Sequence, residues 1–391
     1  MLFHTPSLGD AELAVLDRIE EVRRALRHQL TSQRRWVGLL RRIMFARAIQ
    51  GSNSIEGYNV SLDDAVAAVA ELEPVDAARE PWLAVSGYRD AMTFAVQLAD
   101  DPHFTYDESL IRSLHYMMIK YDLSKAPGRW RPGPVFVRHE PSQEIVYTAP
   151  DASGVPELMR DYVADLREDA GTPAMVRAAM AHLNLVMIHP FKDGNGRMGR
   201  GMQTLVLARE GIVDPPFASI EEYLGENTLP YYQVLGEVGQ GSWHPERDAR
   251  VWVRFVLTAH FFQAQRLVRR AQEAEQRWDA VTNEVKRRRL PERAIAPLFN
   301  ASMGFRLKNA TYREAADVTE IIAGRDLKAI AATGLVDAVG EKRGRYYKAS
   351  PTLQLIERSI RLPRTPPEDP FVNVPQSLWS TSSPTTITTV R

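Results

Sequence analysis

The chain has 391 residues, of which 44% are hydrophobic and 25% are charged, a composition typical of a globular protein with two to three domains. Lysine and arginine number 49, as do aspartate and glutamate, so no overall charge favours nucleic acid or an anionic membrane. Cysteine is absent, which excludes disulfides, thiolate metal sites and cysteine nucleophiles. The N-terminal residues lack a signal-peptide pattern, and no apolar run approaches the ~18 residues of a membrane span. We therefore expect a cytoplasmic protein without a membrane segment.

Residues 1–100 are predicted to form a helical region. Residues 11–48 carry apolar side chains at spacings of three and four, which is the period of an amphipathic helix. Residues 62–72 and 82–98 continue this pattern, and a Glu-Pro break separates them. The arginines of residues 34–47 are interpreted as a solvated helix face.

The middle of the chain predicts helices interrupted by one small hairpin. Residues 106–122 read as a helix, and residues 135–137 and 144–147 have the β-branched and aromatic composition of two short strands. Helices are expected again from about residue 157, then over 174–188, 196–210, 221–237 and 246–290. The fold class is therefore mainly α.

A third region is predicted after a boundary near residues 290–310. Two short helices, at 312–317 and 320–332, precede a hairpin over 335–348, which is the element order of a winged helix; we assign it residues 305–350. Between residues 306 and 348, nine basic and six acidic side chains leave a small positive excess, so both DNA binding and a protein-docking role stay open. Residues 363–391 are rich in Pro, Ser and Thr and predict an extended or disordered tail.

Residues 189–200 carry the pattern that points to chemistry. A proline follows His189 and ends an apolar helix there, while Gly194 and Gly196 permit a tight turn before the next helix. The start of that helix favours an anion, and Arg197 and Arg200 project from one of its faces. Guanidinium groups suit phosphate oxygens, so the segment predicts a phosphate cradle.

Two further side chains complete this set. Asp193 is a hard oxygen ligand for Mg²⁺, which binds through one or two carboxylates together with substrate phosphates. His189 can accept a proton near neutral pH. The set indicates phosphoryl or nucleotidyl transfer; the alternative is a corner between two helices, with glycine for geometry and arginine for surface charge.

This segment resembles the core motif of the Fic family, His-x-Phe-x-Asp/Glu-Gly-Asn-Gly-Arg-x-x-Arg. The matching positions are His189, Phe191, Asp193, Gly194, Asn195, Gly196, Arg197 and Arg200. The resemblance implies an all-helical Fic catalytic domain over residues 101–290, which transfers AMP from ATP to a Ser, Thr or Tyr hydroxyl of a protein target. The predicted hairpin would be the flap that aligns the target. Gly196 stands where the phosphorylating branch of the family has lysine, which speaks against kinase chemistry.

The resemblance also implies roles. His189 would deprotonate the target hydroxyl, Asp193 would hold Mg²⁺, and Phe191 would anchor the loop. The ATP phosphates would be bound by the loop amides, including those of Gly194 and Gly196, and by Asn195, Arg197 and Arg200. Tyr231 and Tyr232 are expected near the adenine, with a place in the core as the alternative.

A second pattern lies at residues 52–57. Ser52 and Glu56 are one helical turn apart, and the segment resembles the family's inhibitory motif, Ser/Thr-x-x-x-Glu-Gly/Asn. The resemblance implies a class II member in which Glu56 pairs with Arg200 and takes the room of the γ-phosphate; the alternative is that Asn53 and Glu56 only cap a helix. An inhibitory glutamate can also support removal of AMP, which the sequence does not separate from AMP transfer. Some class II relatives form dimers, so a homodimer is left open.

Overall fold

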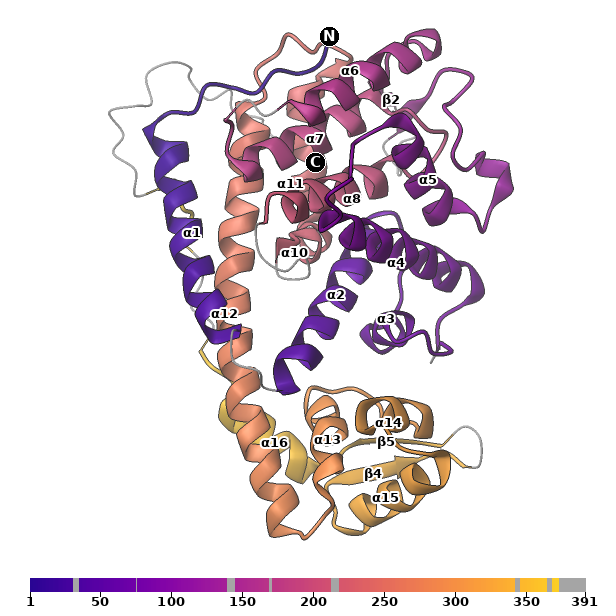
Figure 1. The fold of residues 1–391 in the computed structure, drawn as a ribbon, viewed down its shortest axis with the longest axis vertical. Helices are drawn as coiled ribbons and strands as arrows, with labels where there is room; N and C mark the ends of the chain where they lie inside the picture. Colours follow the sequence, from indigo (N-terminus) through magenta and orange to yellow (C-terminus); the bar gives the residue numbers. More distant parts are fainter. Residues whose placement is uncertain are drawn as a thin grey trace, which may run out of the picture.

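The computed structural model describes residues 1–30, 35–74, 76–138, 145–168, 171–211, 218–341, 345–363 and 368–372. Helices make up most of this part of the chain, as predicted (Figure 1). No helix among these residues is long and apolar enough to cross a membrane.

The part of the chain before residue 120 contains five helices within its described residues, and the first four of them lie in the predicted N-terminal region, residues 1–100. The five helices are α1 (Asp10–Leu30), α2 (Arg35–Ile55), α3 (Leu62–Val69), α4 (Arg79–Ala99) and α5 (Glu108–Ile119). The single helical pattern predicted over residues 11–48 is thus two helices, and residues 31–34 between them lie outside the described part. Helix α3 begins where the Ser61 hydroxyl accepts a hydrogen bond from the Asp64 N–H, and Asp107 caps α5 in the same way.

The predicted hairpin is confirmed and a third strand joins it. Strands β1 (Phe136–Arg138) and β2 (Ile145–Thr148) are antiparallel, whereas β3 (Gly241–Ser242) pairs with β2 in parallel. Residues 139–144, in the expected turn, lie outside the described part. A strand of two residues has no periodic pattern, so the sequence does not reveal β3.

Further helices and two short 3₁₀ turns make up the rest of the middle of the chain. The 3₁₀ turns η1 (Leu123–Lys125) and η2 (Ala152–Gly154) precede α6 (Val155–Arg167), α7 (Ala174–Ile188) and α8 (Asn195–Arg209). Residues 221–237, predicted as one helix, form α10 (Glu221–Glu226) and α11 (Thr228–Gly239). Asn227 divides them because its backbone (φ −122°, ψ 41°) is not helical.

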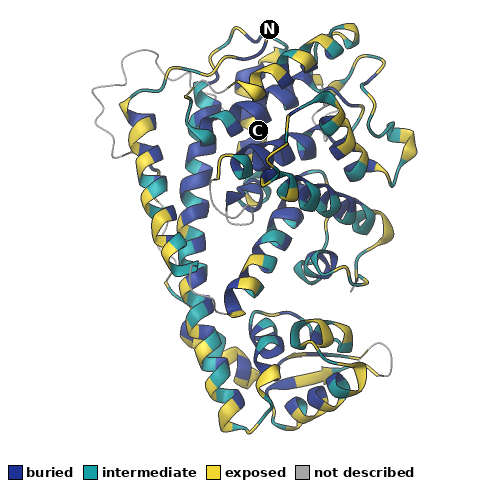
Figure 2. Ribbon diagram, viewed as in Figure 1, coloured by how far each residue is buried: buried dark blue, intermediate teal, exposed yellow. Residues whose placement is uncertain are grey.

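Helix α12 (Arg250–Arg287) runs along most of the molecule, with α1 beside it (Figure 1). Its buried residues contribute to three apolar clusters in turn: one around α7 and α8, one with α2, and one in the C-terminal unit, residues 292–360. Figure 2 shows the upper part of α12 largely dark blue, where other helices surround it, and its lower part with buried, intermediate and exposed residues in alternation. The helix thus joins the C-terminal unit to the rest of the chain.

The C-terminal unit has the predicted order of two helices and a hairpin, with two further helices. Its elements are η3 (Glu292–Ala294), α13 (Ile295–Ser302), α14 (Asn309–Ala316), α15 (Glu320–Ala332), β4 (Val336–Val339), β5 (Tyr346–Ala349) and α16 (Pro351–Ile360). Helix α13 lies in the expected boundary, where Leu298 and Phe299 are buried. A winged-helix identity, DNA binding and the division into domains stay predictions, and Lys342 and Arg343 of the expected turn lie outside the described residues.

The tail is described only at residues 363 and 368–372. Phe371 is buried, the Arg254 guanidinium lies over its ring, and the Pro370 carbonyl accepts a hydrogen bond from Arg18. This short piece therefore packs against α1 and α12. An extended or disordered tail stays a prediction. The other residues of the predicted tail lie outside the described part.

Helices α2 and α10 approach so closely that two glycines are required. A Cβ on Gly51 would lie 2.5 Å from the Glu221 carbonyl oxygen, and a Cβ on Gly225 would lie 2.8 Å from the Cα of Gly51. No side chain fits there without moving the backbone. This contact matters for the site described below, because Gly51 precedes Ser52 on α2.

We expect Gly51→Ala to lower the free energy of unfolding by about 1–3 kcal/mol, because the added methyl group meets main-chain atoms. Gly38→Ala is the matched control on the same helix, since nothing lies within 4 Å of a Cβ at Gly38. That control should raise stability by up to about 1 kcal/mol through helix propensity. Urea unfolding measures both, and equal shifts of the two variants would contradict the close approach.

Candidate functional site

The segment that the sequence marks for chemistry is the loop between α7 and α8. Helix α7 ends at Ile188, and His189 takes a left-handed conformation (φ 53°, ψ 57°) before Pro190. Gly194 has φ 79°, a region that favours glycine, and α8 begins at Asn195. The predicted helix ends are therefore confirmed within one or two residues.

Asn195 closes this loop on itself. Its Oδ1 accepts a hydrogen bond from the Phe191 N–H at 2.9 Å, and its Nδ2 donates to the Phe191 carbonyl at 2.9 Å. Phe191 is fully buried and stacks on His115 with ring centroids 3.6 Å apart. The Asn195 side chain thus orders the loop, and its expected contact with a phosphate stays a prediction.

His115, from α5, supports the loop and was not singled out by the sequence analysis. Its Nδ1 accepts a hydrogen bond from the Gly128 N–H at 2.8 Å, so Nε2 carries the proton and donates to the Asp193 carbonyl at 2.9 Å. Burial lowers the pKa of His115 to about 4. A lone histidine among apolar residues of a predicted helix was the only available signal, and such a pattern does not identify its partners.

The buried histidines predict acid sensitivity of the fold. Burial lowers the pKa of His115 to about 4 and that of His182 to about 3, from 6.5, so the native state binds fewer protons than the unfolded chain below pH 6.5. The stability that their neutral forms contribute is present above that pH and is lost as the pH falls towards 4. We expect urea unfolding to show a loss of about 1.6 kcal/mol per histidine between pH 6.5 and pH 5. His115→Asn should reduce this slope, and an unchanged slope in that variant would contradict the buried neutral ring.

One ring nitrogen of His189, Nε2, has no hydrogen-bond partner among the described residues. His189 Nδ1 donates to the Val186 carbonyl at 3.1 Å, which leaves the lone pair on Nε2. Burial lowers the pKa of His189, and the charge of Arg131 lowers it further, while Glu56 and Asp193 act in the opposite direction. The ring is therefore neutral at pH 7 and able to accept a proton.

The first turns of α8 bring Arg197 and Arg200 together as predicted. Both are fully buried, and Arg197 lies over the Tyr58 ring at 5.0 Å. Arg197 Nε and Nη2 and Arg200 Nη1 are buried without a hydrogen-bond partner among the described residues. Buried donors without acceptors are costly, so this helix start has both the dipole and the free N–H groups to bind an anion.

Glu56 lies at this helix start. Arg200 donates from Nη2 to Glu56 Oε1 at 2.7 Å, from Nε to the Ser52 hydroxyl at 2.8 Å, and from Nη2 to the Ser52 carbonyl at 2.9 Å. A Cβ on Gly196 would lie 2.3 Å from Glu56 Oε1, so the carboxylate covers the first turn of α8. Helix α2 runs through Ile55, so the alternative in which Glu56 caps the start of a helix is wrong.

Asp193 has a cationic partner that the sequence analysis missed. Its Oδ1 accepts from the Gly194 N–H at 2.7 Å, and its Oδ2 lies 2.8 Å from Lys125 Nζ. Burial alone would raise the pKa of Asp193, but Lys125 lowers it below its usual value. Lys125 also donates to the Tyr58 hydroxyl at 2.8 Å, which links Asp193 to the segment that carries Glu56.

A divalent cation fits this site only together with phosphates. The described residues contain no group of three or more His, Asp or Glu side chains that could hold a metal ion. Asp193 supplies one carboxylate, which is sufficient for Mg²⁺ when a nucleotide provides the other oxygens. Lys125 would then have to release Asp193 Oδ2.

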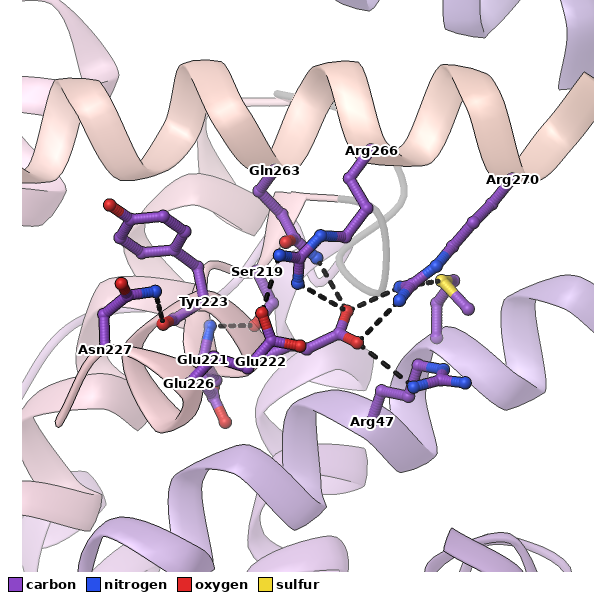
Figure 3. Close-up of polar contacts among 11 residues, drawn as sticks. Arg47, Ser219, Glu221, Glu222, Tyr223, Glu226, Asn227, Gln263, Arg266 and Arg270 are labelled. Carbon is purple, nitrogen blue, oxygen red and sulfur yellow. Dashed lines mark hydrogen bonds and ion pairs between the residues drawn. The ribbon is translucent and has the colours of Figure 1, made fainter. Parts of the chain in front are cut away.

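Two adjacent glutamates of α10 bind different partners. Glu221 accepts a hydrogen bond from the Thr204 hydroxyl at 3.1 Å, and burial raises its pKa to about 7. Glu222 binds Arg270 of α12 at 2.5 and 2.8 Å and Arg47 of α2 at 3.2 Å (Figure 3). Burial by itself raises the pKa of Glu222, but these arginines lower it to about 2. Glu222 therefore ties α10 to α2 and α12.

The two candidate tyrosines occupy different places. Tyr231 is 1% exposed, and its hydroxyl lies 3.0 Å from His182 Nε2, which favours the alternative of a core residue. Tyr232 is 45% exposed and donates to the Ile55 carbonyl at 3.4 Å, at the end of α2. Contact of either with an adenine stays a prediction.

Comparison with known proteins agrees with this geometry. The model of the Fic/DOC family matches residues 105–207. Protein adenylyltransferase fic-1 of Caenorhabditis briggsae is 36% identical over 117 residues, which are 28% of this chain and 21% of that protein. The matches to the curated relatives cover less than a quarter of the length of those proteins.

Solved structures share the fold. A Fic family protein from Desulfovibrio desulfuricans G20 superposes with a TM-score of 0.55 at 22% identity, over 89% of this chain and 98% of that one. A Fic domain containing signaling protein from Bacteroides thetaiotaomicron VPI-5482 gives 0.53 at 20% identity, over 65% and 96%. Residues 105–207 of this chain therefore form a Fic domain, within a helical fold shared with solved Fic family proteins.

Proposed function

We propose that this protein is a nucleotidyltransferase that moves AMP from ATP to a Ser, Thr or Tyr hydroxyl of a target protein and of itself. The observation that carries the proposal is the pairing of a neutral base with an anion site in one loop. His189 Nε2 can accept a proton, and three guanidinium nitrogens of Arg197 and Arg200 are buried without a partner in the described structure. The names of the relatives, protein adenylyltransferases, support the same reaction.

Each side chain then has a chemical role. His189 Nε2 takes the proton of the target hydroxyl, the oxygen forms a bond to the α-phosphorus, and the bond to the pyrophosphate oxygen breaks. Arg197, Arg200 and the N–H groups at the start of α8 hold the phosphate oxygens and stabilise their charge. Asp193 would hold Mg²⁺, which neutralises phosphate charge when bound. Phe191 and Asn195 keep the loop in place for these contacts.

The same proposal includes autoinhibition by Glu56. The carboxylate pairs with Arg200 and covers the first turn of α8, where a terminal phosphate would need the same guanidinium. Ser52 supports this arrangement through two bonds to Arg200. ATP in a reactive position therefore requires Glu56 to move.

The target would add to the hairpin as an extended segment. The sheet order β1-β2-β3 places β1 at an edge, and no strand of the described residues pairs with its outer side, so a further strand could add there. Phe136, Ile145 and Val146 are each more than 40% exposed on this hairpin and would contact the target's side chains.

Label transfer tests the reaction directly. The chain is incubated with Mg²⁺ and ATP labelled at either the α- or the γ-phosphate, and labelled protein is measured as wild type and as Glu56→Gly. We expect α-label on the protein, more in Glu56→Gly, and no γ-label. γ-Label on the protein would indicate a kinase, and no label in either form of a folded protein would contradict AMP transfer.

A further inference from the structure

Arg131 is a buried arginine in which each of the three guanidinium nitrogens donates to a main-chain carbonyl. It is 3% exposed. Its Nε donates to the His189 carbonyl at 2.8 Å, its Nη1 to the Gly133 carbonyl at 2.8 Å, and its Nη2 to the Pro150 carbonyl. Its own N–H donates to the Pro190 carbonyl at 2.9 Å. Among the described residues no carboxylate lies within ion-pair distance of this guanidinium, so we name these contacts the Arg131 carbonyl clamp.

The clamp acts on the strained part of the loop. His189 has φ 53°, which costs a non-glycine residue free energy unless its surroundings hold it. Its carbonyl comes after the last turn of α7 and has no partner within the helix. Arg131 donates hydrogen bonds to this carbonyl and to that of Pro190, so one residue holds two consecutive carbonyl groups of the loop.

The other two contacts reach the hairpin. Gly133 precedes β1, and Pro150 follows β2, so the guanidinium binds the chain on both sides of the flap. The planar fork holds these carbonyls in a fixed relation to that of His189. The base and the surface that would hold the target are therefore connected through one side chain.

We propose that Arg131 is a positioning residue for the transfer reaction: it holds His189 Nε2 in register with a target segment on the flap. The inference rests on the proposed function, because it needs a hydroxyl to deprotonate. Misplacing reacting groups by about 1 Å costs on the order of 10²-fold in rate, so a residue that spaces base and target affects the chemical step. ATP affinity depends instead on α8 and Asp193, which the clamp does not touch.

The test compares Arg131→Met and Arg131→Lys with Arg209→Met, all in Glu56→Gly. Arg209 is the matched control, because it donates to the carbonyls of Ala99 and Asp101 at 2.6 and 2.9 Å, away from the loop. Two quantities are measured: the single-turnover rate of self-labelling with α-labelled ATP, and the pKa of the His189 ring by ¹⁵N NMR. His189→Asn assigns the signal, and calorimetry gives the Kd of Mg-ADP.

We expect Arg131→Met to lower the transfer rate by about 10–100-fold while the Kd for Mg-ADP changes less than about twofold. The pKa of His189 should rise, because a positive charge is removed and the ring becomes more exposed. The transfer rate should therefore increase with pH over a higher pH range than in the Glu56→Gly parent. Arg131→Lys should keep this pKa nearer the parent value and still slow transfer. Arg209→Met should change neither quantity.

An unchanged transfer rate and an unchanged His189 pKa in Arg131→Met would overturn the inference. A decrease in the transfer rate of Arg209→Met as large as that of Arg131→Met would overturn it as well. If Arg131→Met does not fold, Arg131→Lys decides by the same two readouts. A Glu56→Gly parent that transfers no AMP would contradict the proposed function. The His189 titration would still show whether Arg131 holds the ring.

Discussion

His189→Ala should lower AMP transfer by about 10²–10⁴-fold, the usual contribution of a positioned general base. The neutral ring offers only Nε2 as an acceptor, since Nδ1 donates to Val186, and alanine offers none. Phosphate binding depends on α8, so the affinity for Mg-ADP should stay within about twofold of the parent. Single-turnover labelling in the Glu56→Gly background and calorimetry measure the two quantities.

The left-handed backbone at His189 requires a second variant. Alanine at φ 53° is strained, so a loss of activity in His189→Ala could follow from a distorted loop. Asparagine tolerates the left-handed backbone region better than alanine and also lacks a base of suitable pKa. His189→Asn should therefore be as inactive as His189→Ala and at least as stable as that variant. His103→Ala, at an exposed histidine outside the site, is the control for removing an imidazole. Substantial transfer by His189→Asn would contradict the role of the ring as base.

Glu56→Gly should raise AMP transfer by about 10–100-fold. Hydrogen bonds to charged groups contribute about 1.5–3 kcal/mol, and each 1.4 kcal/mol is a factor of ten in the fraction of molecules whose Arg200 is free. The 2.7 Å bond to fully buried Arg200 is of this kind. The gain arises because ATP no longer competes with the carboxylate for the guanidinium.

A stability measurement separates this effect from general loosening. Without Glu56 the buried Arg200 loses its carboxylate, so the variant should melt at a lower temperature and gain more from ATP than the wild type does. Glu71→Gly is the control, because Glu71 forms a similarly short pair, 2.6 Å, with Arg89 and is 77% exposed. It should leave transfer and the ATP-dependent shift in Tm unchanged. A Glu56→Gly variant with wild-type transfer would contradict autoinhibition.

The conformation of the proposed catalytic loop could be predicted because it is local. Pro190 ends α7 at the preceding residue, and Gly194 adopts a backbone angle that other residues avoid. Arg197 and Arg200 then share a face by helix period alone. The pairing of Glu56 with Arg200 needed the family resemblance, because 144 positions separate the two residues.

The contacts that support the loop came only from the structure. His115, Lys125 and Arg131 each bind it from 58 or more positions away in the chain, and none stands in a pattern that names its partner. The short strand β3 and the helices α13 and α16 were missed for a related reason, since brief elements have little periodicity and depend on what they pack against.

The sequence by itself determined the helical fold class, the ends of α7 and α8 and the residue types at the start of α8, because proline, glycine and helix period act over a few residues. Tertiary structure decided which charges meet. Asp193 pairs with Lys125, Glu222 binds arginines of two other helices, and the His189 carbonyl is held by Arg131. Such pairings depend on packing between distant segments and on burial, which strengthens each interaction and penalises every donor left without an acceptor.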